Sequence, residues 1–283
     1  MNNVSILIPL KEYNHELMGN SLLAAIESCV LEDKIKGNEN KGEKYNIYLT
    51  VPENCKDKDK LYENLGSIKE MIHVVEKKDG ESLWFSTQVN EFAKSVDTKW
   101  FSVLEWDDSY CPTTFSNFAT YAEFYPDVDI FMMLNEVYDN SEQMTGYANE
   151  IVWASSFSSE MGVVDFDSLE TFNEYNLTGA FINREKFLEV GGLKESMQVS
   201  FWSEFLLRAT YNNMKVYVIP KVGYTHLVMR KGSLSDYYTN TMSDKEVSWW
   251  INLAKEEYFF KEDRKKTYEE SKSDNVETIE DLK

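Results

Sequence analysis

Three carboxylates stand within four positions in the segment "LEWDDSY" (104–110), directly after the apolar run "WFSVL". Glu105, Asp107 and Asp108 repel one another, and burial beside a strand adds a desolvation cost, so the arrangement calls for a compensating charge. Carboxylates one residue apart can converge on Mg²⁺ or Mn²⁺, and a cation bound in this way commonly also binds substrate phosphate. The alternative is that Asp107 and Asp108 cap a helix beginning near Pro112 or form an Asx turn. These residues alone favour neither interpretation.

The elements that must position this segment can be read from the apolar pattern. Strand-like runs alternate with helical stretches, which is typical of an α/β fold with a mostly parallel sheet flanked by helices. The runs span residues 4–9, 45–51, 72–75, 100–104, 128–134, 179–182 and 216–220. Open sheets of this kind bind ligands at the carboxyl ends of their strands, and the acidic segment follows such an end.

Further signals predict the remaining organisation. Pro112 suits the first turn of a helix whose inner face would be Phe115, Phe118, Ala119 and Ala122. Strand-like residues on both sides of 139–146 predict a hairpin. Ser243 and Glu246 form a capping-box pattern that opens a further helix. We therefore predict one domain over residues 1–240, followed by a C-terminal helix and a charged, flexible tail over residues 241–283.

Charge and composition exclude several functions. The 283 residues include 29 Lys and Arg against 49 Asp and Glu, a net charge of −20. Such a chain should repel nucleic acid and anionic lipid, so direct binding to duplexes is not expected. No apolar run approaches the roughly 20 residues that cross a bilayer, and the N-terminus lacks a basic leader pattern. Three cysteines without a CxxC pair indicate a reducing cytoplasm.

Several segments together resemble a known family. They are "VSILIPLKEYN" (4–14), Gly80 with Asn90, "EWDD" (105–108), "INREKFLEVGGLKE" (182–195), "FWSEFLLRATYNNMKVYVIP" (201–220) and "YTHLVMRKGSLS" (224–235). In this order and spacing they resemble the GT-A glycosyltransferases, in particular the large inverting family 2. The resemblance covers residues 4–235 and implies a GT-A, Rossmann-like fold. It also implies transfer of a sugar from a nucleotide-diphosphate donor, most readily a UDP-sugar, to an unknown acceptor, with Mn²⁺ or Mg²⁺ as cofactor.

The resemblance also implies roles for single residues. Asp107 would be the principal metal ligand, Glu105 would contact the metal or the ribose, and Asp108 would be a supporting acid. His226 stands where some relatives have an additional metal ligand. The residues implied in binding the nucleotide are Pro9, Tyr13, Glu53, Asn90 and Arg230. Glu53 replaces the acidic pair usual in the family, so the identity of the base stays open.

An inverting transfer needs a carboxylate that removes the acceptor's proton. The family takes it from an acid-bearing helix, where this chain has "WSEFLLR" with Glu204 as the candidate. Glu204 lies four residues before Arg208 instead of the more usual six, so Asp165 or Asp167 is an alternative base. Glu204 could equally form an ordinary i,i+4 ion pair with Arg208. Trp106 and Trp202 are expected near the site because of their neighbours.

Two other functions compete with the transferase. The departures at Glu53, Glu105 and Glu204 are also what a catalytically degenerate GT-A fold, kept as a binding or structural module, would have. A nucleotidyltransferase on a similar sheet is the third hypothesis. It is disfavoured because no Gly-rich phosphate loop follows the first strand.

Overall fold

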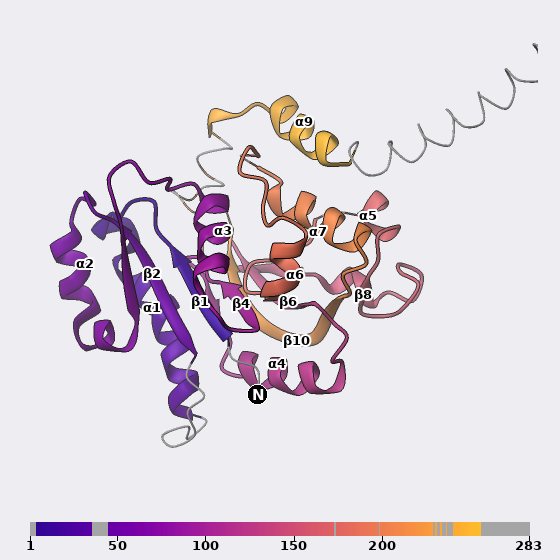
Figure 1. Ribbon diagram of the computed structural model, residues 1–283, viewed down its shortest axis with the longest axis horizontal. Helices are drawn as coiled ribbons and strands as arrows, with labels where there is room; N and C mark the ends of the chain where they lie inside the picture. The colour runs from indigo at the N-terminus through magenta and orange to yellow at the C-terminus, as the bar shows by residue number, and fades with distance from the viewer. Residues whose placement is uncertain are drawn as a thin grey trace, which may run out of the picture.

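A computed structural model describes residues 4–35, 45–172, 174–197, 199–228, 230, 233, 236 and 240–255. Its strands form a sheet in the order β3-β2-β1-β4-β9-β6-β10-β5, with helices on both faces (Figure 1). The strands are β1 (Val4–Pro9), β2 (Asn46–Pro52), β3 (His73–Lys77), β4 (Trp100–Val103), β5 (Ser109–Tyr110), β6 (Ile130–Tyr138), β7 (Met144–Ala148), β8 (Val163–Val164), β9 (Phe181–Asn183) and β10 (Val216–Leu227). The α-helices are α1 (His15–Ile35), α2 (Lys58–Leu65), α3 (Phe85–Ser95), α4 (Thr114–Phe124), α5 (Ser168–Thr171), α6 (Arg184–Glu189), α7 (Phe201–Tyr211) and α9 (Asp244–Lys255), and the 3-10 helices are η1 (Gly66–Met71) and η2 (Glu150–Trp153).

The first half of the chain forms the parallel part of the sheet. β1 pairs in parallel with both β2 and β4, and β2 pairs in parallel with β3. β1 is buried along its whole length, because a parallel strand with helices on both faces has no solvent side. The sheet therefore turns the carboxyl ends of β1 and β4 to the same edge. This confirms the predicted α/β class.

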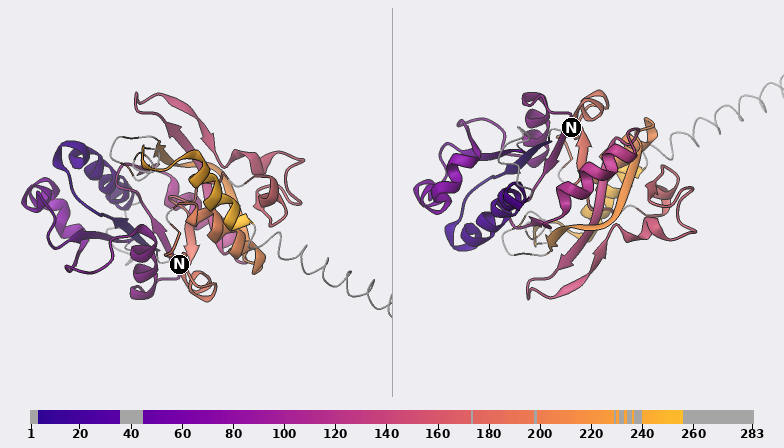
Figure 2. Two further views of the ribbon diagram at one scale, coloured as in Figure 1. Left: turned by 90° about the horizontal axis from the view of Figure 1, so that it is seen from above. Right: turned by 90° about the horizontal axis from the view of Figure 1, so that it is seen from below.

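The second half departs from the parallel pattern. β9 lies between β4 and β6 and runs antiparallel to both, whereas β10 runs parallel to β6. The short β5, which contains the residues after the acidic segment, pairs antiparallel with β10. The predicted hairpin is present as β6 and β7, which extend away from the body of the molecule (Figure 2).

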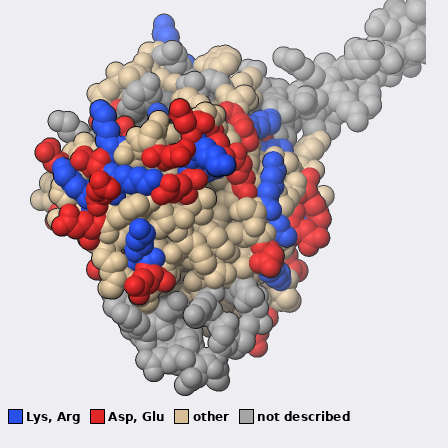
Figure 3. Space-filling view, turned by 60° about the vertical axis from the view of Figure 1, so that its left-hand side comes forward, with Lys and Arg blue, Asp and Glu red and all other residues tan. Residues whose placement is uncertain are grey.

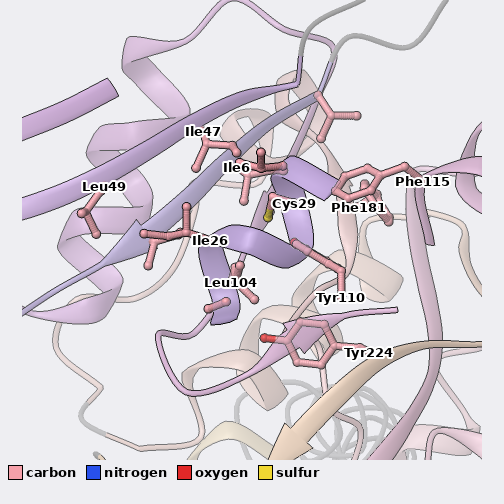
Figure 4. Packing of buried hydrophobic residues seen from close by; sticks show 14 of the residues in the cluster. Ile6, Ile26, Cys29, Ile47, Leu49, Leu104, Tyr110, Phe115, Phe181 and Tyr224 are labelled. Carbon is pink, nitrogen blue, oxygen red and sulfur yellow. The ribbon is translucent and has the colours of Figure 1, made fainter. Parts of the chain in front are cut away.

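Two apolar cores lie on opposite faces of the sheet. Alternate residues of β1 enter different cores, since Ile6 and Ile8 pack with α1, α2 and α4, while Leu7 packs with α3, α6 and α7. Figure 4 shows the first core, in which Tyr110 and Phe115 pack beside residues of α1.

The helix after Pro112 is confirmed as α4. Phe115, Phe118 and Ala122 are buried, but the prediction that Ala119 belongs to the inner face is wrong, because this side chain is exposed. Thr114 is buried as well, so the buried face of α4 is centred further from Ala119 than the sequence pattern indicates.

The C-terminal part of the described chain packs on the domain. α9 begins directly after Ser243, as its capping pattern predicts, and lies against α7 (Figure 1). The charged tail predicted after this helix, up to residue 283, lies outside the described residues, and the domain boundary predicted at residue 240 stays a prediction. Within the ranges given above, no helix has the length and apolar composition to span a bilayer.

Candidate active site

The acidic segment leaves the carboxyl end of β4, as the sequence predicts. The Leu104 amide still donates to the carbonyl of Leu7 at 2.9 Å, so the chain follows β1 for one more residue. It then turns, with the Asp108 amide donating to the carbonyl of Glu105 at 3.1 Å, and enters β5. The strand end therefore fixes the start of the segment, and β5 fixes its end.

Asp108 ties this turn to β10. Its side chain is buried, and Oδ1 accepts a hydrogen bond of 2.9 Å from the amide of Leu227. Its Oδ2 lies 2.9 Å from Nδ1 of His226. Two of the predicted site residues thus meet each other, and Asp108 fastens the acidic turn to a strand more than a hundred residues away.

Glu105 is held from two sides. Its amide donates to the Tyr224 hydroxyl at 3.3 Å, and its Oε1 accepts from Oγ1 of Thr178 at 3.0 Å. The Tyr224 ring lies against Gly179, where φ is +76° and a Cβ would collide with the ring. Glycine is required here for both reasons, and its substitution would displace the tyrosine that orients Glu105.

The electrostatics of the segment are those of crowded, partly dehydrated acids. Burial and the charge of Asp108 raise the pKa of Glu105 to about 7. Burial and the charges of Asp108 and Glu105 raise the pKa of Asp107 to about 7. Burial alone would lower the pKa of His226, but the hydrogen bond and charge of Asp108 outweigh it and raise that pKa to about 9. A bound cation would relieve the repulsion between Glu105 and Asp107.

A cavity of about 570 Å³ opens beside these acids, at the carboxyl ends of β1 and β4. Pro9, Glu105, Trp106 and Asp107 line it, together with segments from the start of α1, the start of α3 and the loop before α7. Ser233, Asp236, Asn240 and Thr241 complete the lining. This position matches the edge of an open α/β sheet at which ligands bind.

Arg230 is not among the lining residues, but it contacts two of them, Trp106 and Leu17. Its guanidinium group stacks on Trp106, with 4.9 Å between the guanidinium carbon and the ring centroid, and Nη2 donates to the carbonyl of Leu17 at 2.9 Å. Its Nη1 is buried without a hydrogen-bond partner. An arginine with one satisfied and one unsatisfied nitrogen is suited to bind an anionic oxygen.

A second hollow of about 530 Å³ shares Lys11, Glu12 and Asn14 with the first, and of the residues predicted to bind the nucleotide only Tyr13 lines it. Tyr13 lines it, and its hydroxyl accepts from the Asn64 amide at 3.0 Å. Glu53 is exposed between Pro52 and Asn54, both of which line this hollow.

Asn90 is not among the residues that line the cavity and instead fixes the loop before α7. Its Nδ2 donates to the carbonyl of Leu193 at 2.8 Å and to Oε1 of Glu195 at 3.0 Å, and its Oδ1 accepts from the Leu193 amide at 2.7 Å. Gly192, with φ of +67°, leaves no room for a Cβ beside the Asn90 oxygen. Asn90 therefore positions Glu195, a cavity residue to which the sequence analysis gave no role. The only signal was its place at the end of the Gly-Gly-x-x-Glu pattern.

Glu204 is not among the residues that line the cavity. Its side chain is fully buried in α7, where Arg208 binds both carboxylate oxygens at 2.8 and 2.9 Å. Nζ of Lys194 lies 3.1 Å from Oε1. Arg208 also donates to the carbonyls of Val190 and Gly192, so the i,i+4 pair acts as a clamp on the same loop.

The other predicted residues are also placed by their contacts. Asp165 accepts hydrogen bonds from Ser159 and from the Ser168 amide at the start of α5, away from the cavity lining. Trp106 lines the cavity, whereas Trp202 packs edge-on against Phe85 and Phe205.

Across the described part of the chain, no group of three or more His, Cys, Asp or Glu side chains is arranged to hold a metal ion. Glu105 and Asp107 are the two acids of the segment 105–108 that line the cavity. Mg²⁺ and Mn²⁺ sites of phosphate-transferring proteins commonly use one or two carboxylates and complete their coordination with substrate phosphate and water. The donor set fits such a site, with Asp107 and Glu105 as ligands, while Nδ1 of His226 is engaged with Asp108.

Comparison with known proteins identifies the fold. No family model and no curated protein matches the sequence. Among solved structures, residues 1–349 of TarS from S. aureus match with a TM-score of 0.57 and 11% identity over 80% of this chain and 60% of that one. The same protein in complex with UDP-GlcNAc matches with a TM-score of 0.59 and 10% identity over 89% and 65% of the two chains. The mannosyltransferase PcManGT from Pyrobaculum calidifontis, in complex with GDP-Man and Mn²⁺, matches with a TM-score of 0.53 and 11% identity over 82% and 58%.

At these identities the likeness concerns the fold. The chain has a GT-A glycosyltransferase fold, which confirms the expectation drawn from its sequence. It spans 58 to 65% of the length of the three structures.

Proposed function

We propose that this chain is a metal-dependent glycosyltransferase that moves a sugar from a nucleotide-diphosphate donor to an acceptor, with inversion at the anomeric carbon. The observation that carries this proposal is the pair Glu105 and Asp107 on the wall of a 570 Å³ cavity, at the edge of a GT-A sheet where ligands bind. A UDP-sugar is the first donor to test, because TarS was solved with UDP-GlcNAc and with UDP. A GDP-sugar is the second, since PcManGT was solved with GDP-Man and Mn²⁺.

Asp107 and Glu105 would hold the cation, and a bound Mg²⁺ or Mn²⁺ would stabilise the negative charge that develops on the departing diphosphate. The pKa values of both acids, raised to about 7, support this assignment, because a cation favours the ionised forms that burial and repulsion disfavour. His226 would act indirectly, by fixing Asp108 and with it the turn that carries Asp107.

The residues around the two acids would orient the donor and the cation. Arg230 would donate its unpartnered Nη1 to a diphosphate oxygen while its stacking on Trp106 holds the guanidinium plane. Pro9 and Tyr13 would place the nucleoside, with Glu53 at the base. Tyr224 and Thr178 hold Glu105 in one orientation, so the proposed cation site would need little rearrangement when the substrate binds.

The test combines binding with turnover. Because a ligand that binds only the native state raises the melting temperature, UDP or GDP with Mn²⁺ should stabilise the protein, and neither component alone should do so fully. A panel of nucleotide sugars should then show Mn²⁺-dependent release of nucleoside diphosphate. Asp107→Ala should abolish this release and keep the melting temperature without ligand close to that of the wild type.

Two results would count against the proposal. If Asp107→Ala still releases nucleoside diphosphate at the wild-type rate, Asp107 does not take part in the reaction and the proposed mechanism is wrong. Stabilisation by nucleotide without release of nucleoside diphosphate from any donor would favour the alternative, a GT-A fold that serves as a binding module. The departures at Glu53 and Glu105 from the family pattern are the observations that support this alternative.

A further inference from the structure

The transfer proposed above needs a carboxylate within reach of the acceptor, and α7 does not supply one. The residues from 196 to 211 contain a single acid, Glu204. Its side chain has no exposed surface, and both of its oxygens are bound by Arg208. A fully buried carboxylate that is paired with two cations and does not line the cavity cannot contact a sugar hydroxyl there.

Glu195 has the properties that Glu204 lacks. It lines the cavity together with Glu105 and Asp107, and it is exposed. Its Oε1 accepts from Nδ2 of Asn90 at 3.0 Å, and its Oε2 accepts from Oγ1 of Thr87 at 3.0 Å. Both donors are uncharged, and each carboxylate oxygen keeps a lone pair for a substrate hydroxyl.

The loop that carries Glu195 is fixed from both sides. Asn90 binds the backbone of Leu193 in both directions, and Arg208 binds the carbonyls of Val190 and Gly192. Gly192 allows the closest approach between this loop and α3. So many contacts around one short loop hold the exposed carboxylate in place, as a general base requires.

We propose that Glu195 is the general base of this site, an inference that rests on the transferase function proposed above. As the acceptor oxygen forms its bond to the anomeric carbon, its proton passes to the Glu195 carboxylate, and the bond between the anomeric carbon and the diphosphate oxygen breaks with its electron pair leaving on the nucleoside diphosphate. Asn90 and Thr87 are positioning residues for Glu195. Glu204 and Arg208 position the loop.

The experiment compares Glu195→Gln with the wild type in the nucleotide-sugar panel described above, with water or the best acceptor found. The variant keeps an oxygen for Asn90 and an amide for Thr87, so the fold should be retained. Loss of a positioned base costs about 10²- to 10⁴-fold in rate. We expect kcat to fall by at least a hundredfold, the KM for the donor and the stabilisation by UDP with Mn²⁺ to stay unchanged, and Glu195→Asp to restore part of kcat.

Controls separate the outcomes. Glu189→Gln, which removes an exposed acid of the neighbouring α6 paired with Lys186, should turn over normally. A wild type that neither binds nucleotide nor turns over defeats the proposed function itself. A wild type that turns over while Glu195→Gln matches it defeats only the assignment of Glu195. Asp236 is another acid that lines the cavity. If Asp236→Asn loses turnover while Glu195→Gln retains it, the assignment of Glu195 as the base is wrong.

Discussion

Neighbouring acids in the segment 105–108 have different partners, and the partners decide their roles. Asp108 is buried and bonded to His226 and to the Leu227 amide, so it serves the fold. Asp107 faces the cavity and is crowded by the charges of Asp108 and Glu105. Three residues that are chemically alike in the sequence thus divide into one structural acid and two that are available to a ligand.

The pairing of His226 with Asp108 makes a prediction about pH. Because the pKa of His226 is raised from about 6.5 to about 9 in the folded state, its contribution to stability is fully present below about pH 6.5 and is lost as the pH rises through about 9. At most it is worth about 3 kcal/mol, at about 1.4 kcal/mol for each unit of pKa. The free energy of unfolding of the wild type should exceed that of His226→Gln at pH 6 to 7.

The difference between these two proteins should shrink as the pH is raised from 7 to 10, in urea titrations without added metal. Because all other titratable groups are present in both proteins, their effects on the free energy of unfolding cancel in the difference. A difference that stays constant over this range would mean that His226 is neutral in the folded protein and only accepts or donates a neutral hydrogen bond.

At the scale of secondary-structure elements, the clamp between α7 and the loop 190–195 stands out. Glu204 and Arg208 lie one helical turn apart, and Arg208 also binds two carbonyls of the loop. Removing one partner of a buried ion pair costs about 3–5 kcal/mol, because the other charge stays buried. Lys194 still neutralises part of the Glu204 charge, so we expect about 3 kcal/mol for Arg208→Met in urea unfolding.

The double variant Glu204→Met with Arg208→Met supplies the control. Since it leaves no buried charge, it should be more stable than Arg208→Met alone. If the two substitutions instead destabilise the protein additively, the ion pair does not act as a unit. The same experiment tests the role of Glu204 without an activity assay.

Much of this architecture could be predicted from the sequence, for physical reasons. β1, β2 and β4 are mostly apolar runs with helical spacing between them, and Pro112 lies two residues before the helix that follows the acidic segment. The direction of β9 could not be predicted, because a run of three or four apolar residues carries no information about which strands it will pair with.

The roles of the site residues were less accessible. An acid four residues before an arginine looks the same in sequence whether the pair is exposed or buried, so the enclosure of Glu204 was not visible. Asp108 and His226 are 118 positions apart, and only the fold brings them together. Asn90 lies where the resemblance places a nucleotide contact, but its partners are Leu193 and Glu195, which no local pattern indicates.

At the scale of the whole molecule, net charge is the dominant feature. The chain carries −20, yet on the face shown in Figure 3 the acidic side chains lie among lysines and arginines and do not form one continuous patch. The charged residues that line the cavity are mostly negative. They are five acids and one lysine: Glu12, Glu105, Asp107, Glu195, Asp236 and Lys11. The proposed anionic donor would therefore need a bound cation to offset the repulsion from these acids.

Self-repulsion predicts how salt affects the protein. Screening becomes effective over about 10 Å at 0.1 M salt, so the melting temperature should rise when NaCl is increased from 10 to about 100 mM. Asp107→Asn, which removes one cavity charge, should show a similar rise, because the effect comes from the whole surface. A melting temperature that falls with salt would show that attractive pairs outweigh the repulsion.

The residues that line the cavity come from widely separated parts of the sequence, from Pro9 to Thr241. During synthesis the ribosome releases β1, β4 and the acidic turn long before β10 exists, so Asp108 emerges without the histidine and the amide that later hold it. A nascent chain arrested after β5 would expose these acids to water, without the residues of β10 and of the later cavity lining. A ligand that needs the whole lining should therefore bind only after the segment that contains Thr241 has been made and has folded onto the domain.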